Sequence, residues 1–458
     1  MNPEEQPSSK KTLWIGLGIF FFLLLAGGLV WYFWGGGNTG GVTKLFPFSP
    51  SSGEDVPQTD TDRHEIGGDS NGDSGLVAAD RLFRQLSLKP VAGAYALKRD
   101  GEQYVRFIEK ETGHAYEIPL AGGVAEQLTN TTIPRIAIAD WALGGNAVLL
   151  RYLEEDRYTG RETIKTHLAR LNLSSALSSD DVGGLTLDFL PDNIVALSVS
   201  PDGKSLFYII KKDGAAVGSV VNVATKATKE VFRSPFTEWL PQFLNNGSIL
   251  LSTKPSGAVP GYSYVYDPKT KALNRLVREK DGLTALANAS GSRVLYGENV
   301  AGNAILNSYD PKGFPGDEGT VFYENIIPIN TLPEKCAWLS DNMRVLCGAF
   351  NLTPTGLIPD LWYQGRISFN DTFWLANTTS GDVTYLSDPK EETGQTFDVA
   401  NPLLSEDGAY FIFTNKKDGM LWSMRLPQQV GPETSDTIPE GLSPEELKDA
   451  QGSLQAPQ

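Results

Sequence analysis

SVSPDGKSLFYII, from Ser198 to Ile210, places a tight turn between two runs of strand-forming residues. Pro201 presets the backbone at the second turn position, Asp202 can hydrogen-bond nearby backbone groups, and Gly203 accepts a positive φ. The residues on both sides are mostly aliphatic, β-branched or aromatic, which is typical of strands. This stretch therefore predicts a β-hairpin.

The GKS triplet inside this stretch is not a phosphate-binding loop. Such a loop has the pattern G-x-x-x-x-G-K-[ST], in which the first glycine lets backbone N–H groups surround a phosphate. Ser198 occupies the position of that first glycine. The triplet belongs to the turn, and the sequence predicts no cofactor.

Six further segments repeat the pattern of a turn followed by a strand rich in β-branched and aromatic residues. They are KRDGEQYVRFI (98–108), WALGGNAVLLRY (141–152), FLNNGSILLST (243–253), NASGSRVLYGE (288–298), WLSDNMRVLCG (338–348) and LSEDGAYFIFT (404–414). The turn glycine, replaced once by Asn342, recurs at steps of 44, 58, 44, 44, 51 and 66 residues. A period of about 40–50 residues is typical of a propeller blade with four strands. Seven copies predict an all-β, seven-bladed β-propeller.

The ends of the repeat region predict how the ring closes. The last blade has only three expected strands, at about 399–405, 409–414 and 420–426. The segment LFRQLSL (82–88), upstream of the first blade, also has strand character. We predict that it forms the outer strand of the last blade, within a propeller that covers 81–427, because this pairing removes free sheet edges. The alternative is that 82–88 forms an extra helix or loop.

The segment 13–34, LWIGLGIFFFLLLAGGLVWYFW, contains 22 residues without a charge. At about 1.5 Å per residue, a helix of this length spans about 33 Å, enough for the core of a bilayer. Lys10 and Lys11 precede it, and no Lys or Arg follows before Lys44. The positive-inside rule then places residues 1–12 in the cytoplasm and the propeller outside, on a single-pass membrane protein. The alternative, a cleaved signal peptide, has a shorter apolar core that ends at small residues, whereas this segment ends in aromatic residues.

Two polar segments flank the propeller. Residues 35–80 are rich in Gly, Ser, Asp and Pro, which is typical of a flexible linker. Residues 428–458 are again polar, and we predict a disordered tail. The propeller is thus expected to be tethered at some distance from the membrane.

SPDGKSLFY and its relatives resemble the TolB-like, WD-repeat-like propeller repeats of bacterial envelope proteins. The resemblance covers about 82–427 and implies the fold rather than an activity. The repeats also resemble the propeller halves of prolyl-oligopeptidase-like enzymes, in which catalysis belongs to a separate α/β-hydrolase domain. The 31 residues after 427 contain no such domain.

Four other stretches are similar to a group of uncharacterised, membrane-anchored propellers from small-genome bacteria. They are VRFIEKETGHAYEI (105–118), NTTIPRIAIADW (130–141), KCAWLSDNMRVLCG (335–348) and PDLWYQGRISFND (359–371). This resemblance implies a membrane anchor and brings no activity with it.

Motifs that suggest catalysis or metal binding occur here in unsuitable contexts. GDSNG (68–72) matches the G-x-S-x-G of hydrolases, but polar linker flanks it instead of a strand and a helix. DSNGDSG (69–75) resembles the start of a calcium loop, but Ser74 replaces the glycine at position six and Asp80 the glutamate at position twelve. His64, His114 and His167 have no second His or Cys at ligand spacing, so no metal site is predicted.

The two cysteines, Cys336 and Cys347, flank the turn at Asp341 and Asn342. A two-residue turn puts them directly opposite each other and permits a disulfide outside the cytoplasm. If the turn instead copies SPDG, with a bulge at Asn342, we expect the register to shift by one residue and to separate the thiols. Two buried free thiols are the remaining alternative.

The net charge of the chain is −16, and residues 91–427 contribute −8 of it. Nucleic-acid binding needs a basic face, so a nucleic-acid partner is not predicted.

Two long loops offer surfaces for a partner. EEDRYTGRE (154–162) carries Arg157, Tyr158 and Arg161, and NLTPTGLIPDLWYQGRISFNDT (351–372) carries Trp362, Tyr363 and Arg366.

Aromatic residues and arginine in loops are typical of surfaces that contact a protein or a glycan. The alternative for Trp362 and Tyr363 is that they fold back and cover the core of their own blade.

Two classes of function remain. One is a binding or scaffold module outside the cell, and the other is a propeller enzyme that acts on an envelope glycan or peptide. A cluster of carboxylates about 5–10 Å apart at the axis favours the enzyme, and an axis without such a cluster favours binding.

Overall fold

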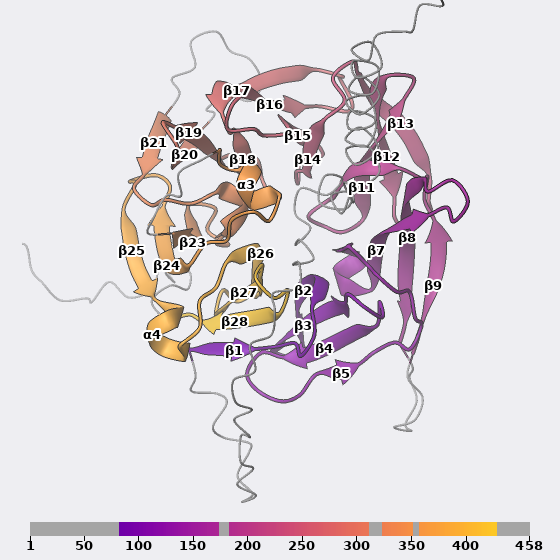
Figure 1. The fold of residues 1–458 in the computed structure, drawn as a ribbon, viewed down its shortest axis with the longest axis horizontal. Helices are drawn as coiled ribbons and strands as arrows, with labels where there is room; N and C mark the ends of the chain where they lie inside the picture. The colour runs from indigo at the N-terminus through magenta and orange to yellow at the C-terminus, as the bar shows by residue number, and fades with distance from the viewer. Residues whose placement is uncertain (1–81, 174–182, 311–322, 351–356, 428–458) are drawn as a thin grey trace, which may run out of the picture.

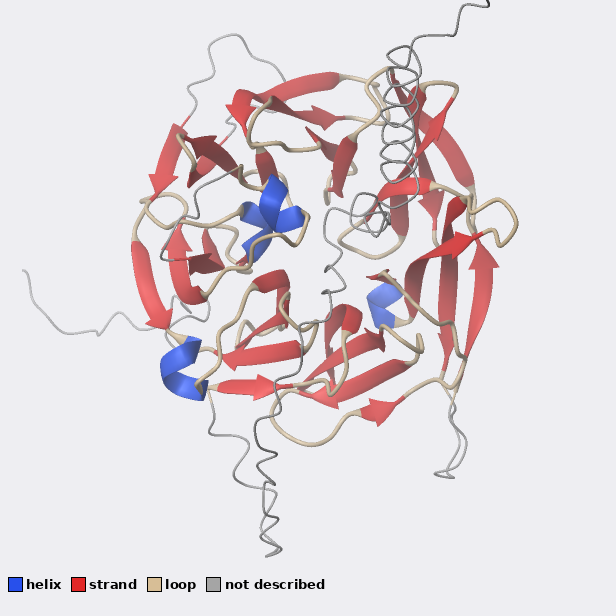
Figure 2. Ribbon diagram, in the orientation of Figure 1, coloured by secondary structure: helices blue, strands red, loops and turns tan. Residues whose placement is uncertain are grey.

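In the computed structural model, the described residues are 82–173, 183–310, 323–350 and 357–427. They form seven four-stranded antiparallel sheets, arranged as blades around a central axis (Figures 1 and 2). This confirms the all-β, seven-bladed β-propeller. Strands dominate the ring, and the few helices are short (Figure 2).

From the axis outwards, the first three blades are β2 (Val91–Arg99), β3 (Glu102–Glu109), β4 (Ala115–Pro119) and β5 (Glu126–Gln127); β6 (Ile138–Ala142), β7 (Ala147–Glu155), β8 (Glu162–Asn172) and β9 (Gly184–Phe189); and β10 (Ile194–Val199), β11 (Ser205–Lys212), β12 (Ala215–Asn222) and β13 (Thr228–Ser234). The next two are β14 (Trp239–Phe243), β15 (Ile249–Thr253), β16 (Pro260–Tyr266) and β17 (Leu273–Asp281); and β18 (Thr284–Ala287), β19 (Val294–Val300), β20 (Asn303–Asp310) and β21 (Tyr323–Ile327). The last two are β22 (Cys336–Trp338), β23 (Arg344–Phe350), β24 (Asp371–Asn377) and β25 (Val383–Ser387); and β26 (Val399–Leu404), β27 (Tyr410–Asn415), β28 (Leu421–Arg425) and β1 (Phe83–Gln85).

Short helices lie outside the blades: the 3-10 helices η1 (Leu143–Gly145) and η2 (Pro333–Lys335), and the α-helices α3 (Asp360–Tyr363) and α4 (Pro389–Thr393).

The seven predicted turns all join the two innermost strands of a blade. In the opening stretch, Gly203 has φ 69° and its N–H donates to the carbonyl of Ser200. Asn342, the substitute for glycine in blade 6, has φ 60° and makes the same bond to Leu339. Positive φ is the reason that this turn position is glycine in six blades and asparagine in the seventh.

The strand predicted over 82–88 is β1, and it pairs with β28 in the register Phe83↔Met424. The N–H of Leu86 donates to the carbonyl of Leu421, which extends the pairing. Phe83 is buried and packs against the rings of Phe373 and Phe397. Segments at opposite ends of the propeller therefore close the ring in one sheet, between blades 1 and 6 (Figure 1).

The apolar core lies between neighbouring blades rather than within one layer. Between blades 6 and 7, Phe373 packs against Phe411 and Phe413. Between blades 3 and 4, Phe232 packs edge-to-face against Trp239 and Tyr266. Each blade is stabilised by its two neighbours, so the ring buries apolar surface on both faces of every sheet.

Cys336 and Cys347 are partners in the β22–β23 pairing and are linked by a disulfide. The turn between them does copy the SPDG turn, and the expected shift of register was wrong. Both turns close with a pair that leaves four residues in the loop, Ser200 with Ser205 in blade 3 and Leu339 with Arg344 in blade 6. The left-handed residue lies within those four, so it changes the shape of the turn without displacing the strands.

Within residues 82–173, 183–310, 323–350 and 357–427, no helix has the length and apolar character needed to cross a bilayer. The predicted membrane span at 13–34, the linker at 35–80 and the tail at 428–458 lie outside the described residues.

Candidate ligand site at the centre of the ring

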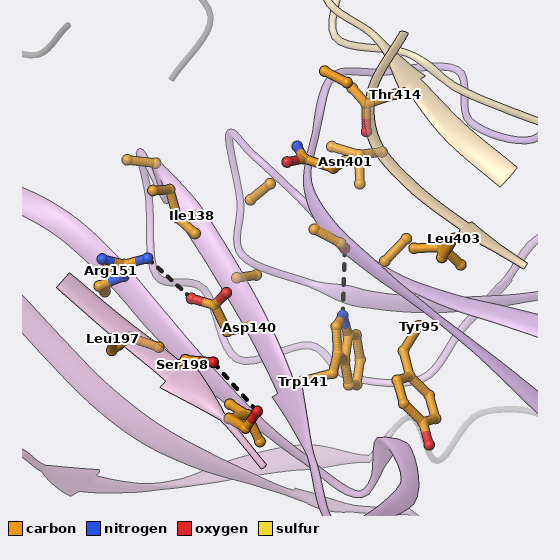
Figure 3. A pocket seen from close by; sticks show the side chains of 18 of the residues that line it. Tyr95, Ile138, Asp140, Trp141, Arg151, Leu197, Ser198, Asn401, Leu403 and Thr414 are labelled. Carbon is orange, nitrogen blue, oxygen red and sulfur yellow. Dashed lines mark hydrogen bonds and ion pairs between the residues drawn. The ribbon is translucent and has the colours of Figure 1, made fainter. Parts of the chain in front are cut away.

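A cavity of about 500 Å³ lies where the innermost strands of five blades begin. Its described lining comes from β2, β6, β10, β14 and β26, together with Arg151, Thr414 and Lys416 of the neighbouring strands and turns. Figure 3 shows residues from these segments around one space. The volume is that of a pocket for a small organic molecule or the end of a chain.

Small residues at the start of the inner strands leave room for this cavity. The lining includes Ala92, Gly93, Ala94, Ala139 and Ala196. Gly93 is required by packing, because a Cβ there would lie 1.9 Å from the carbonyl oxygen of Ala139 on the next blade. The wall is therefore mainly apolar and formed by closely spaced backbones.

Two prolines and a bulge shape the wall further. Pro241 in β14 and Pro402 in β26 line the cavity. Innermost strands have one edge that faces the axis, so a proline there removes no ladder hydrogen bond. The register of β26 shifts between Ala400 and Leu403, and Asn401 in this bulge has φ 48°. Bulges of this kind redirect side chains beside functional sites, and the exposed Asn401 lines the cavity.

The cavity contains a partly buried ion pair. Arg151 Nη2 donates to Asp140 Oδ2 at 3.1 Å, and their side chains are 8% and 34% exposed (Figure 3). Among the described residues that line the cavity, Asp140 is the only carboxylate. The pair of carboxylates expected of a glycan-cleaving site is therefore not found among these residues.

Lys416 forms the rim of the cavity next to blade 6. It follows β27 directly, and its backbone N–H donates to the carbonyl of Asp398, just before β26. Its Nζ lies 5.2 Å from the centre of the Trp362 ring. Burial lowers the pKa of Lys416, opposed by the charge of Asp398.

Residues 357–371, here called the blade-six cap, lie beside this rim and contain α3. The helix lies nearer to the centre of the ring than the outer strands of its own blade (Figure 1). The cap also reaches two other blades. The N–H of Gly257 donates to Asp360 Oδ2 at 2.6 Å, and Asn299 Nδ2 donates to the carbonyl of Ile358 at 3.0 Å.

A buried charge cluster anchors the cap to blades 6 and 7. Lys335 Nζ lies 2.7 Å from Asp371 Oδ2 and 2.5 Å from Asp398 Oδ1, and all three side chains are fully buried. Asp398 also accepts hydrogen bonds from Trp362 Nε1 at 3.0 Å and from the N–H of Phe369 at 3.1 Å. The cap is held by an ion pair that water does not screen.

The environment moves the pKa values within this cluster in different directions. Burial raises the pKa of Asp371 to about 6, although Lys335 opposes the shift. Burial acts in the same direction on Asp398, but Lys335 and several hydrogen bonds outweigh it and lower the pKa of that carboxyl. Burial would lower the pKa of Lys335, and the two carboxylates reverse this and raise it.

The structure separates the predicted partner-binding residues into two groups. Trp362 is 1% exposed and Tyr363 is buried, with its hydroxyl donating to Glu334. These two side chains cover the core of blade 6 and are not surface contacts. Both pack in the apolar cluster of the cap, and the indole N–H of Trp362 donates to the buried Asp398. Arg366, Arg157, Tyr158 and Arg161 are exposed, and the last three lie on the turn between β7 and β8.

The residues of the cavity and the charge cluster were not predicted as site residues. They are Asp140, Arg151, Lys416, Lys335, Asp371 and Asp398. Two of them had a signal in the sequence, because Asp140 and Asp398 are charges within or beside strongly apolar inner strands, in IAIADW and TFDVA. The partner of Asp140 comes from the next strand, and those of Asp398 come from η2 and the blade-six cap, so the pairings could not be predicted from the sequence.

No protein-family model matches the sequence, and no curated protein matches it significantly. Solved structures of propellers do resemble the chain. The tricorn protease has 13% identity and a TM-score of 0.45 over 75% of this chain, but only 34% of its own chain. The β-propeller domain of Cps50 (Swd1) from Myceliophteria thermophila has 11% identity and a TM-score of 0.47, covering 75% of this chain and 100% of its own. TolB from Acinetobacter baumannii has 13% identity and a TM-score of 0.38, covering 73% and 80%. These neighbours include both enzymes and other propellers, and the likeness concerns the fold alone.

Proposed function

We propose that the chain is a binding module that is held outside the cell by its N-terminal membrane segment and presents the axial cavity to a ligand or partner. The observation that carries this proposal is the chemistry of the cavity wall. It is mainly apolar, it exposes the free edges of inner strands, and the single carboxylate among its described residues is paired with Arg151. Such a wall suits recognition of a ligand more than acid–base chemistry.

The anchor and the linker predicted from the sequence support the same proposal. A flexible segment of about 45 residues has a root-mean-square length of roughly 35–40 Å. A propeller tethered in this way would reach molecules at or above the membrane surface. The protein or glycan partner expected from the sequence is part of the proposal, and the exposed loop at 154–162 provides a second surface for it.

The experiment is a capture with the full chain in detergent micelles. The protein is immobilised and exposed to solubilised envelope and glycan extracts, and retained and cleaved material is identified by mass spectrometry. Ala137→Trp narrows the cavity, because Ala137 is half-buried and lines it. Ala227→Trp, on an exposed turn of blade 3, is the matched control.

A component that the wild type and Ala227→Trp retain and Ala137→Trp loses supports binding in the cavity. A component that all three proteins retain equally contradicts the cavity as the site. Material that is cleaved rather than retained supports the alternative, a propeller enzyme that acts on an envelope glycan or peptide.

A further inference from the structure

The cations and carboxylates that line the axial cavity are unequal in number. Arg151 and Lys416 are the cations, and Asp140 is the carboxylate among the described residues of the lining. Asp140 is already paired with Arg151 at 3.1 Å. The charge left without a counterpart in this lining is the ammonium of Lys416.

The neighbouring carboxylate of Asp398 attracts the ammonium of Lys416 and opposes the lowering of its pKa, but the oxygens of this carboxylate are bonded to other donors. Asp398 Oδ1 accepts from Lys335 and Trp362, and its Oδ2 accepts from Ser368 Oγ at 3.0 Å and from the N–H of Phe369 at 3.1 Å. Its lone pairs are therefore occupied. In the described part of the chain, no carboxylate forms an ion pair with Lys416, whose ammonium instead faces the ring of Trp362 at 5.2 Å.

A half-buried lysine without a hydrogen-bonded anion is costly, because burial removes water from its charge. This cost lowers the pKa of Lys416. The ring of Trp362 compensates in part, since a cation over an aromatic face gains electrostatic energy. An anion brought by a ligand would offset the cost of burying the ammonium and form a charge-assisted hydrogen bond with it.

Accordingly, we propose that the axial cavity binds a molecule that carries a carboxylate on an apolar body, with the carboxylate paired to Lys416. This inference rests on the proposed function, since it concerns the same cavity. One lysine suits a monoanion, whereas a phosphate is usually bound by an Arg fork or by several cations. The small apolar residues Ala92, Ala94, Ala139 and Ala196 would contact the apolar body.

Two sources share this chemistry: a free aliphatic acid and the C-terminus of a peptide. The test uses 4-methylpentanoate, a pool of N-acetylated tripeptides with free C-termini, and the same pool with amidated C-termini. Binding to the full chain in detergent is measured by saturation-transfer NMR and then by calorimetry on the strongest ligand. Binding of the tripeptide acids alone identifies a peptide end, and binding of 4-methylpentanoate identifies a free acid.

The variants are Lys416→Gln, Lys416→Arg and, as control, Lys204→Gln, whose wild-type lysine side chain is 75% exposed on a turn of blade 3. We expect the amides to bind at least about 10-fold more weakly than the acids, which is about 1.4 kcal/mol. Lys416→Gln should lose affinity to a similar extent, Lys416→Arg should retain most of it, and Lys204→Gln should match the wild type.

Equal binding of acids and amides, or unchanged affinity in Lys416→Gln, would overturn the inference. So would the absence of any binding of carboxylates. If the capture experiment still retains a component that Ala137→Trp loses, this inference fails while the proposed function stands. If Ala137→Trp retains the same components as the wild type in that capture, the proposed function fails together with this inference.

Discussion

Two loops on the propeller have similar composition and opposite structures. The blade-two loop at 154–162 and the blade-six cap both contain arginine and aromatic side chains. In the first loop, Tyr158 is 98% exposed, and Asp156 accepts hydrogen bonds from the N–H groups of Tyr158 and Thr159. In the cap, Trp362 is 1% exposed and its indole N–H donates to Asp398.

The difference lies in what surrounds the aromatic residues. Six of the nine residues of EEDRYTGRE are charged, so that loop has little apolar surface to bury and satisfies its backbone by itself. The cap contributes Ile358, Phe369 and the aromatic pair to one cluster with Phe350 and Leu332. The indole N–H of Trp362 also has a buried acceptor, the carboxylate of Asp398 on blade 7. Aromatic residues and arginine therefore predict an exposed contact surface only where the rest of the loop is polar.

The largest effect that tests this comparison is expected from the removal of Asp398. In Asp398→Ala, Lys335 loses one of its two carboxylates inside the protein, and the donors of Trp362 and Phe369 lose their acceptor. Breaking a buried ion pair from one side costs about 3–5 kcal/mol of unfolding free energy. Urea unfolding of the full chain in detergent, followed by tryptophan fluorescence, measures this loss.

Asp156→Ala is the matched variant in the blade-two loop, since it also removes an aspartate that accepts several hydrogen bonds. We expect a far smaller loss of stability, because water replaces those bonds. Equal losses in the two variants would show that the cap is no more firmly held than the exposed loop.

The same two loops show how far the sequence predicts this molecule. The turns, the blade number and the pairing of 82–88 with the last blade follow from local signals, namely glycine at the turn, alternation in the strands and the spacing between copies. The charge cluster does not follow from local signals. Lys335 and Asp398 are 63 residues apart and meet only when blades 6 and 7 are packed. The disulfide was partly predictable from the sequence. Its two cysteines belong to one hairpin, so only the shape of the turn between them decided whether they lie opposite each other.

The pH dependence of stability offers a sharper test of the cluster. Burial raises the pKa of Asp371 to about 6 from its ordinary value of 3.8, so between these pH values the folded protein holds a proton that the unfolded chain has released. Its contribution is therefore greatest below about pH 4 and decreases as the pH rises to about 6. The lowered pKa of Asp398 acts in the opposite sense, and its contribution is lost in more acidic solution as the pH falls through its folded pKa.

Unfolding free energies measured between pH 4 and pH 6 should thus decrease for the wild type relative to Asp371→Asn. The slope is at most about 1.4 kcal/mol per pH unit, the value for one proton. Parallel curves for the two proteins would mean that Asp371 is ionised throughout this range and that Lys335 outweighs burial.

The smallest effect on stability is expected in the blade-two loop. A variant with Arg157→Ala, Tyr158→Ala and Arg161→Ala should keep the melting temperature of the wild type, because these side chains are exposed and contribute little to the fold. It should also bind carboxylate probes with unchanged affinity, since none of the three residues lines the axial cavity in the described part of the chain. If this loop contributes to a partner surface, as we propose, the same variant should retain less of a protein or glycan partner in the capture experiment. A lower melting temperature would mean that the loop is packed like the cap, and the contrast between the two loops would then not hold.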